Sequence, residues 1–247
     1  MKLNARLAKL GFETADRAVR PRLILSLCGL EKQGKTHFAL TAPGPLCFFD
    51  LDAGTEGVVS KFSDKDVWVK PVLKMAEGDD QDDIEREWDS FSKAYYAAFR
   101  IPEIRTIVLD TASEVWELLR LARFGRLTQV MPYQYGPVNK EYRQLLRAAE
   151  KSDKNLVLLH RMKAEYFNDK RTGRHERAGF SGTGFDVQVN ARCYRYDADD
   201  GGEFALQVEN CRQNPELAGM ELTGDLCNYQ MMASLALPDV DPSAWEG

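Results

Sequence analysis

The residue types best suited to chemistry stand together near the start of the chain, in the run Gly29-Leu30-Glu31-Lys32-Gln33-Gly34-Lys35-Thr36, followed by His37. This run has the G-x-x-x-x-G-K-T spacing of a phosphate-binding loop. Its two glycines let backbone amides turn inward around a phosphate at the start of a helix. Lys35 is expected to bring a positive charge to the β- and γ-phosphates, and the Thr36 hydroxyl to bind Mg²⁺. The run therefore predicts a nucleotide site formed by residues 29–37.

Carboxylates end two of the apolar runs that follow this loop. Asp110 closes the run "TIVLD", a position that suits a second Mg²⁺ ligand beside Thr36. Many P-loop ATPases place a water-activating glutamate directly after this aspartate, but Thr111 stands there, so the base must come from elsewhere. Asp52, at the end of "LCFFDLD", is the first candidate, and Glu56 four residues later is the second. The alternative for Asp52 is a turn residue before a glycine.

A histidine ends a third apolar run, "NLVLLH" at residues 155–160. If the strands are parallel, His160 lies at the same edge of the sheet as the phosphate loop. An imidazole there could sense the γ-phosphate. A lone histidine is also often a structural residue, and the sequence leaves both roles open.

Short apolar runs alternate with amphipathic stretches along most of the chain. Strands are expected over residues 22–28, 46–52, 67–73, 104–110 and 155–160, with helices between them. Such an alternation predicts a mostly parallel sheet covered by helices on both faces. The segments 185–196 and 203–211 alternate around the turn signal "DADDGG" and predict a C-terminal antiparallel hairpin. The predicted fold class is therefore α/β.

Basic residues gather in two places, although the formal net charge is −5. The segment 161–183, expected to be a long loop, combines cations with aromatic rings, and Arg123 and Arg126 precede two tyrosines in a second loop. Single-strand binders pair cations that follow the backbone with rings on which bases stack, so both loops predict a site for single-stranded DNA. The alternative is a pair of solvated loops. The candidate DNA-binding residues of the first loop are Arg161, Lys163, Lys170, Arg171, Arg174, Arg177 and Phe180.

Five segments, in this order, resemble the RecA-like phage nucleotide-binding proteins, small relatives of RecA and RadA linked to single-strand annealing and recombination. The segments are "GLEKQGKT", "CFFDLDAG", "TIVLDTASEVW", "NLVLLHRMKAEY" and "GFSGTGFDVQVNARCYRY". The resemblance spans residues 22–225 and implies a RecA-like P-loop core. Its first segment is specific for the P-loop superfamily, whereas the others depend on their order and spacing.

The resemblance also implies roles for individual residues. Asp52 falls where RecA-like proteins carry the glutamate that polarises the attacking water, and the shorter side chain departs from that pattern. His160 matches a γ-phosphate sensor that signals to the following DNA-binding loop, 161–183. Arg212 matches a basic residue that reaches the ATP of the neighbouring subunit. ATP and Mg²⁺ are thus the implied cofactors, and the implied partners are single-stranded DNA, further copies of the chain in a ring or filament, and a single-strand-binding protein.

Three segments are expected along the chain: an N-terminal extension (1–21), the ATPase core (22–236) and a flexible acidic tail (237–247). No apolar run approaches the ~20 residues of a membrane helix, and five cysteines without a pairing pattern favour a reducing compartment. A cytoplasmic location, in a phage-infected bacterium, is therefore expected. Two other functions stay open: an ATP-binding replication adaptor or helicase-loader-like protein with little turnover, and a small-molecule P-loop kinase.

Overall fold

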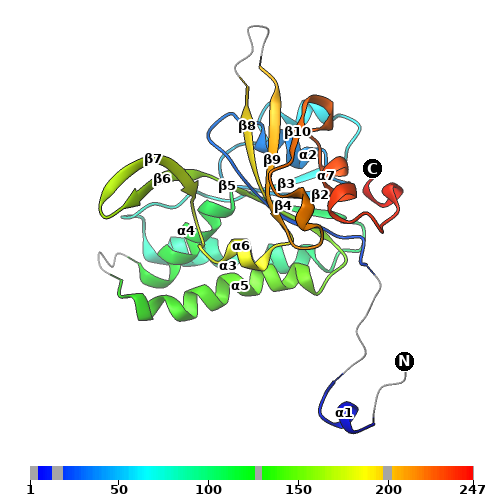
Figure 1. Cartoon of the computed structure of the whole chain (residues 1–247). Coiled ribbons are helices and arrows are strands. Elements are labelled where there is room, and N and C mark those ends of the chain that lie inside the picture. The colour runs from blue at the N-terminus through cyan, green and yellow to red at the C-terminus, as the bar shows by residue number, and fades with distance from the viewer. Residues whose placement is uncertain (1–4, 13–18, 126–129, 197–201, 247) are drawn as a thin grey trace.

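The computed structural model describes residues 5–12, 19–125, 130–196 and 202–246. Its main sheet contains β1 (Ile24–Cys28), β2 (Leu46–Asp50), β3 (Val67–Pro71), β4 (Thr106–Asp110), β5 (Asn155–His160), β8 (Val189–Arg195), β9 (Phe204–Cys211) and β10 (Glu221–Thr223). The strand order is β10-β9-β8-β1-β5-β4-β2-β3 (Figure 1). The strands from β3 to β8 in this order are parallel, and β9 is antiparallel to both of its neighbours, β8 and β10.

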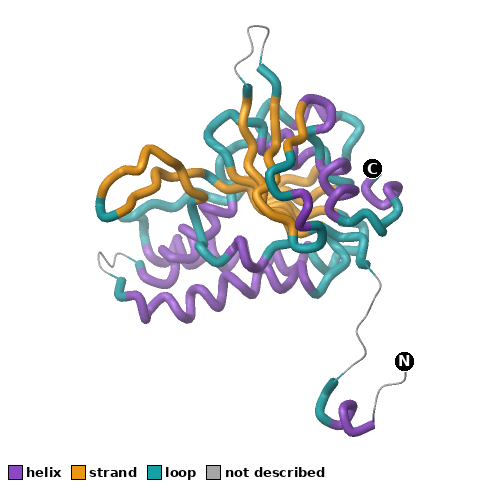
Figure 2. The backbone as a smooth tube through the Cα atoms, viewed as in Figure 1, coloured by secondary structure: helices purple, strands orange, loops and turns teal. Residues whose placement is uncertain are grey.

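Helices cover both faces of this sheet (Figure 2). The helices along the chain are α1 (Ala5–Lys9), which lies apart from the sheet, and α2 (Lys35–Leu40), α3 (Gln81–Ala98), α4 (Ala112–Phe124), α5 (Tyr135–Glu150), α6 (Thr183–Asp186) and α7 (Tyr229–Ala236). Short 3₁₀ turns occur at Val59–Phe62, Pro132–Gln134, Pro215–Leu217, Gly224–Leu226 and Pro242–Trp245. Along β1, Ile24 packs in the core under α3, α4 and α5, whereas Leu25 and Leu27 pack in the core with α2 and α7. Both faces are buried, which explains the continuous apolar strands. The predicted fold class is confirmed.

The long helix α3 follows the aromatic spacing of its sequence. Trp88, Phe91 and Tyr95 form a buried stripe against the sheet, and Asp80 caps the first turn by accepting a hydrogen bond from the amide of Asp82. A stripe at this spacing lies on one side of a helix, so burial of that side fixes α3 on the sheet. None of the described helices has the length and apolar character needed to cross a membrane.

The segment after His160 is a β-hairpin rather than the long loop predicted from the sequence. Its strands β6 (Met162–Phe167) and β7 (Lys170–Arg177) form a separate two-stranded sheet that stands away from the main sheet (Figure 1). Asn168 and Asp169 both adopt positive φ, 48° and 58°. Two left-handed residues in succession make the tight turn that matches the twist of a hairpin. The prediction of irregular structure is wrong because this turn closes the two flanking stretches into a strand pair.

The C-terminal segment also differs from its prediction. Trp245 is only 1 % exposed and belongs to the core, and Arg105 donates hydrogen bonds to the carbonyl oxygens of Ala244 (2.5 Å) and Glu246 (2.7 Å). The prediction of a flexible tail is therefore wrong for residues 237–246. The predicted boundaries at residues 22 and 236 stay predictions.

Candidate functional site

The phosphate loop connects β1 to α2 and is shaped by close backbone contacts. Lys32 and Gly34 have positive φ, 59° and 83°, a backbone form that turns amides inward. A Cβ on Gly29 would lie 2.7 Å from the carbonyl oxygen of Cys193, and one on Gly34 would lie 2.7 Å from the ring of Phe204. Both positions therefore require glycine, Gly29 for reasons of space and Gly34 for reasons of space and conformation.

The side chain of Lys35 lies across its own loop. Its Nζ donates hydrogen bonds to the carbonyl oxygens of Gly29 (2.9 Å) and Leu30 (2.7 Å). Burial lowers the pKa of Lys35 below its usual value. The ammonium group is thus held where the P-loop pattern places the phosphates, and phosphate oxygens would replace two neutral carbonyl acceptors with charged ones.

Two oxygen ligands suited to Mg²⁺ meet beside this loop. The hydroxyl of Thr36 donates to Oδ2 of Asp110 over 2.7 Å. The backbone of Gly54 closes the third side, because a Cβ there would lie 2.7 Å from Asp110 Oδ2 and 3.1 Å from Thr36 Oγ1. The described residues hold no cluster of three or more His, Cys, Asp or Glu side chains that could enclose a metal ion alone. This donor set fits Mg²⁺, which usually keeps several waters and binds phosphates together with one or two protein ligands.

Asp110 is buried at the end of β4, with 3 % of its surface exposed. Burial raises its pKa to about 6, although the hydrogen bond from Thr36 opposes this shift. When bound, Mg²⁺ would neutralise charge on the β- and γ-phosphates. Thr36 and Asp110 would hold the ion, and Lys35 would orient the phosphates. We call the edge of the sheet formed by the carboxyl ends of β1, β2, β4 and β5, together with the loops that follow these strands, the phosphate edge.

Asp52 lies at the phosphate edge, as predicted, but it is engaged in an ion pair. The guanidinium of Arg161 bridges Asp52 and Glu114, with Nε 3.0 Å from Asp52 Oδ2. Glu114 is a site residue that sequence reasoning missed, and its side chain is only 12 % exposed. The signal was its place one helical turn after Asp110, where Thr111 caps α4 by accepting from the amide of Glu114.

The other acids of this region have different surroundings. Asp50, the last residue of β2, is buried and accepts hydrogen bonds from the amides of Gly54 (3.0 Å) and Thr55 (3.1 Å). It therefore shapes the turn that brings Gly54 against Asp110. Glu56 is exposed and lines a cavity of about 700 Å³ together with Asp52 and Arg161. Its catalytic role stays a prediction.

His160 lies at the end of β5, next to β1, and is completely buried. Its Nδ1 lies 3.2 Å from the carbonyl oxygen of Ala178, which makes this nitrogen the donor, and Nε2 has no hydrogen-bond partner among the described residues. Burial lowers the pKa of His160 to about 3, helped by the charge of Arg177. The imidazole is thus neutral, and a direct sensing role would require it to become accessible.

The predicted DNA-binding residues divide into an exposed and an internal group. Phe180 is 3 % exposed and packs with Trp116 and Tyr142, so the prediction that it stacks on bases is wrong. Arg177 donates to Ser26 Oγ (3.0 Å) and Asn190 Oδ1 (2.7 Å) in the interior. These two side chains point inward because the chain returns to the core after β7. Arg161 is 39 % exposed but is paired with Asp52 and Glu114, and its predicted role in DNA binding stays a prediction.

The exposed group lies on the hairpin. Its four cations, Lys163, Lys170, Arg171 and Arg174, belong to solvent-facing positions of β6 and β7, and the rings of Tyr166 and Phe167 are 60 % and 72 % exposed. The second predicted DNA-binding region differs from the hairpin in its described residues. Arg123 makes two hydrogen bonds to Glu141, and Arg126 lies outside the described residues.

Two further predicted nucleotide-binding residues are placed as follows. His37 packs edge-on to Phe62, with ring centroids 4.8 Å apart, and stacks beside Phe204. Arg212 follows β9 at the opposite end of the sheet from the phosphate loop of the same chain, since Cys211 pairs with Val189. A contact from Arg212 to ATP would have to be made to another subunit.

The AAA domain family matches residues 22–183, well over half of the 247-residue chain. The chain belongs to this family. The match contains the phosphate loop, Asp52, Asp110 and His160, so the predicted P-loop nucleotide site lies within the AAA domain. The finer resemblance, to phage proteins of annealing and recombination, stays a prediction.

Two solved structures are similar to this AAA domain protein. One is the RadB recombinase, at 12 % identity and a TM-score of 0.47, over 81 % of this chain and 86 % of that one. The other is a KaiC-like protein from the hyperthermophilic archaeon Pyrococcus horikoshii OT3, at 13 % identity and a TM-score of 0.44, over 77 % and 80 %. No curated protein matches the chain.

Proposed function

We propose that this protein is an ATPase that binds single-stranded DNA, with ATP bound between subunits and controlling the affinity for DNA. The observation that carries the proposal is the continuity of β5, Arg161 and the hairpin. β5 runs beside β1, and one residue after His160 the chain enters β6. The element that exposes cations and aromatic rings therefore starts at the phosphate edge.

Arg161 links the hairpin to the candidate catalytic carboxylate. It is the single residue between β5 and β6, and its guanidinium holds the candidate base Asp52 and the neighbouring Glu114. A movement of the hairpin on binding DNA would shift Arg161 and release Asp52 to act on water. DNA would thus stimulate hydrolysis, and by linkage ATP would alter DNA affinity by the same coupling free energy.

The test is ATP hydrolysis by the full chain with and without a single-stranded oligonucleotide. We expect stimulation in the wild type and no turnover in Lys35→Ala, because the lysine charge at the phosphates is lost. Lys93→Ala is the matched control, since Lys93 is exposed on α3, away from the loop. A wild-type rate that does not respond to DNA would contradict the proposal.

A second candidate is an adaptor that binds ATP with little turnover. It is favoured by the ion pair that occupies Asp52, together with the absence of a glutamate at position 111. Tight nucleotide binding by the wild type, with negligible turnover at saturating DNA, would select this candidate.

A further inference from the structure

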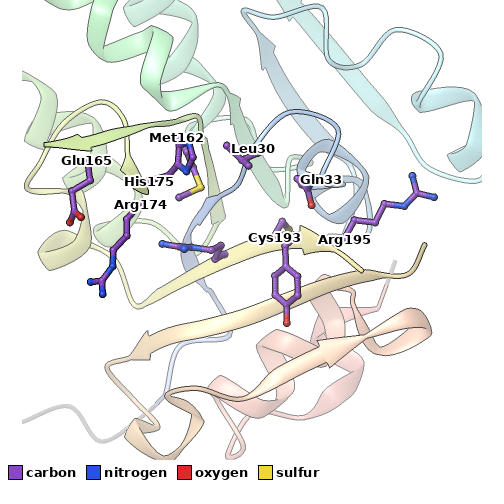
Figure 3. Close-up of a pocket in the computed structure, with 10 residues that line it drawn as sticks. Leu30, Gln33, Met162, Glu165, Arg174, His175, Cys193 and Arg195 are labelled. Carbon is purple, nitrogen blue, oxygen red and sulfur yellow. The ribbon is translucent and has the colours of Figure 1, made fainter. Parts of the chain in front are cut away.

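A cavity of about 780 Å³ lies between the phosphate loop, the β6–β7 hairpin and β8 (Figure 3). It is distinct from the Thr36–Asp110 pair, although two loop residues line it. Leu30 and Gln33 come from the loop, Met162, Glu165, Arg174 and His175 from the hairpin, and Arg192, Cys193, Tyr194 and Arg195 from β8. The cavity therefore joins the nucleotide loop to the exposed hairpin.

The cavity exists because β8 continues where β1 stops. The two strands are paired up to Cys28 and Arg192, after which β1 turns into the phosphate loop while β8 continues to Arg195. Gly29 passes so close to β8 that a Cβ would meet the carbonyl oxygen of Cys193. From Cys193 to Arg195, the edge of β8 on the side of β1 has no strand beside it among the described residues. This edge forms one wall of the cavity.

The lining is cationic and contains unsatisfied polar atoms. Three arginines and His175 line it together with a single carboxylate, Glu165. Arg192 pairs with Glu209 through Nη2 (3.3 Å), but its Nε is buried without a hydrogen-bond partner among the described residues. The same is true of Oε1 of Gln33. A buried donor and a buried acceptor that lack partners in the protein are costly, so each needs a water or a ligand beside it.

We propose that this cavity receives one nucleotide unit of single-stranded DNA. A nucleotide unit carries an anionic phosphate for the arginines and a base edge with both donors and acceptors. Oε1 of Gln33 would accept from the base, Nε of Arg192 would donate to it, and Arg174 would contact the phosphate. Because Gln33 belongs to the phosphate loop, occupancy by DNA is communicated directly to the ATP site. This inference rests on the proposed function, since it assigns the place where DNA binds.

The experiment measures binding of a fluorescein-labelled oligothymidylate to the full chain by anisotropy, with Arg174→Glu compared with Arg171→Glu. Both arginines are exposed on β7 and undergo the same charge change, but Arg171 stacks on Tyr166 outside the cavity. We expect Arg174→Glu to weaken binding about tenfold or more and Arg171→Glu to weaken it about threefold or less. Thermal melting verifies that both variants fold.

A second measurement locates the DNA. An oligonucleotide containing 5-iodo-deoxyuridine, irradiated on the wild-type protein, should crosslink to the β8 peptide that contains Tyr194. Equal weakening by the two variants, or crosslinks only outside the cavity, would overturn the inference while leaving DNA binding intact. Displacement of the crosslink by ADP alone would also overturn it, because the cavity would then hold the base of the P-loop nucleotide. Absence of any DNA binding by the wild type would instead remove the proposed function.

Discussion

At the phosphate edge, Thr36, Asp110 and the backbone of Gly54 lie in contact with one another, and Asp110 is 3 % exposed. On the β6–β7 hairpin, one residue after β5, Phe167 is 72 % exposed and the cations face solvent. The first region is fixed by its neighbours, whereas the second is a two-stranded sheet with little support beyond its own pairing. A single substitution should therefore alter structure and chemistry together at the edge but binding alone on the hairpin.

The largest expected effect is on stability, and it distinguishes a phenylalanine in the core from one on the exposed hairpin. Phe180 packs between Trp116 and Tyr142 under Arg143, so Phe180→Ala should reduce the free energy of unfolding by about 3–5 kcal/mol. Phe167→Ala, at the hairpin turn, should change it by less than about 0.5 kcal/mol. Urea unfolding monitored by circular dichroism measures both. Comparable losses of stability would mean that the hairpin is part of the core.

The next effect concerns the crowded backbone of the phosphate edge. In Gly54→Ala the new methyl group would displace Asp110 Oδ2, 2.7 Å away, and we expect the affinity for Mg²⁺–ATP to fall on the order of 10²-fold. Gly136→Ala is the control, because a Cβ at Gly136 on α5 meets no atom within 4 Å. Isothermal titration with a nucleotide analogue measures the two affinities. Unchanged binding by Gly54→Ala would exclude the Thr36–Asp110 pair as the metal site.

A smaller effect should appear in the pH dependence of stability. Burial keeps His160 neutral in the folded state, with a pKa of about 3, whereas the unfolded chain binds a proton below about pH 6.5. His160 should therefore give the free energy of unfolding a pH slope of its own, with no effect above about pH 6.5 and a loss of about 2 kcal/mol between about pH 6.5 and 5. Asp110 opposes this loss, because its folded pKa of about 6 makes the folded state bind a proton over the same range. His160→Asn should remove this slope, and His175→Asn, at an exposed position of the hairpin, should retain it. A slope that persists in His160→Asn would assign it to other groups.

The contrast between the phosphate edge and the hairpin also explains which features could be predicted from the sequence. Apolar strands, the G-x-x-x-x-G-K-T run and Asp110 are local signals, and the structure brings Lys35, Thr36 and Asp110 together at one edge as expected. The ion pairs of Arg161 with Asp52 and Glu114 join residues far apart in sequence, and composition alone cannot separate a charge bound to a carboxylate from one facing solvent. The prediction of Phe180 on a DNA surface fails for the same reason, because aromatic rings suit both a core and a stacking site.

The smallest expected effect tests the hairpin itself. Lys163 and Glu176 face each other across β6 and β7, 3.1 Å apart, with side chains 59 % and 49 % exposed. An exposed pair of this kind contributes at most about 1 kcal/mol, so Lys163→Gln should change the free energy of unfolding by about 0.5 kcal/mol or less. The same variant should weaken binding of single-stranded DNA and lower the salt dependence of that binding, by about 0.7 in log–log slope for each phosphate that the protein no longer neutralises. Stability that falls while DNA binding is unchanged would assign Lys163 to the fold of the hairpin, and its charge would then not serve a nucleic acid.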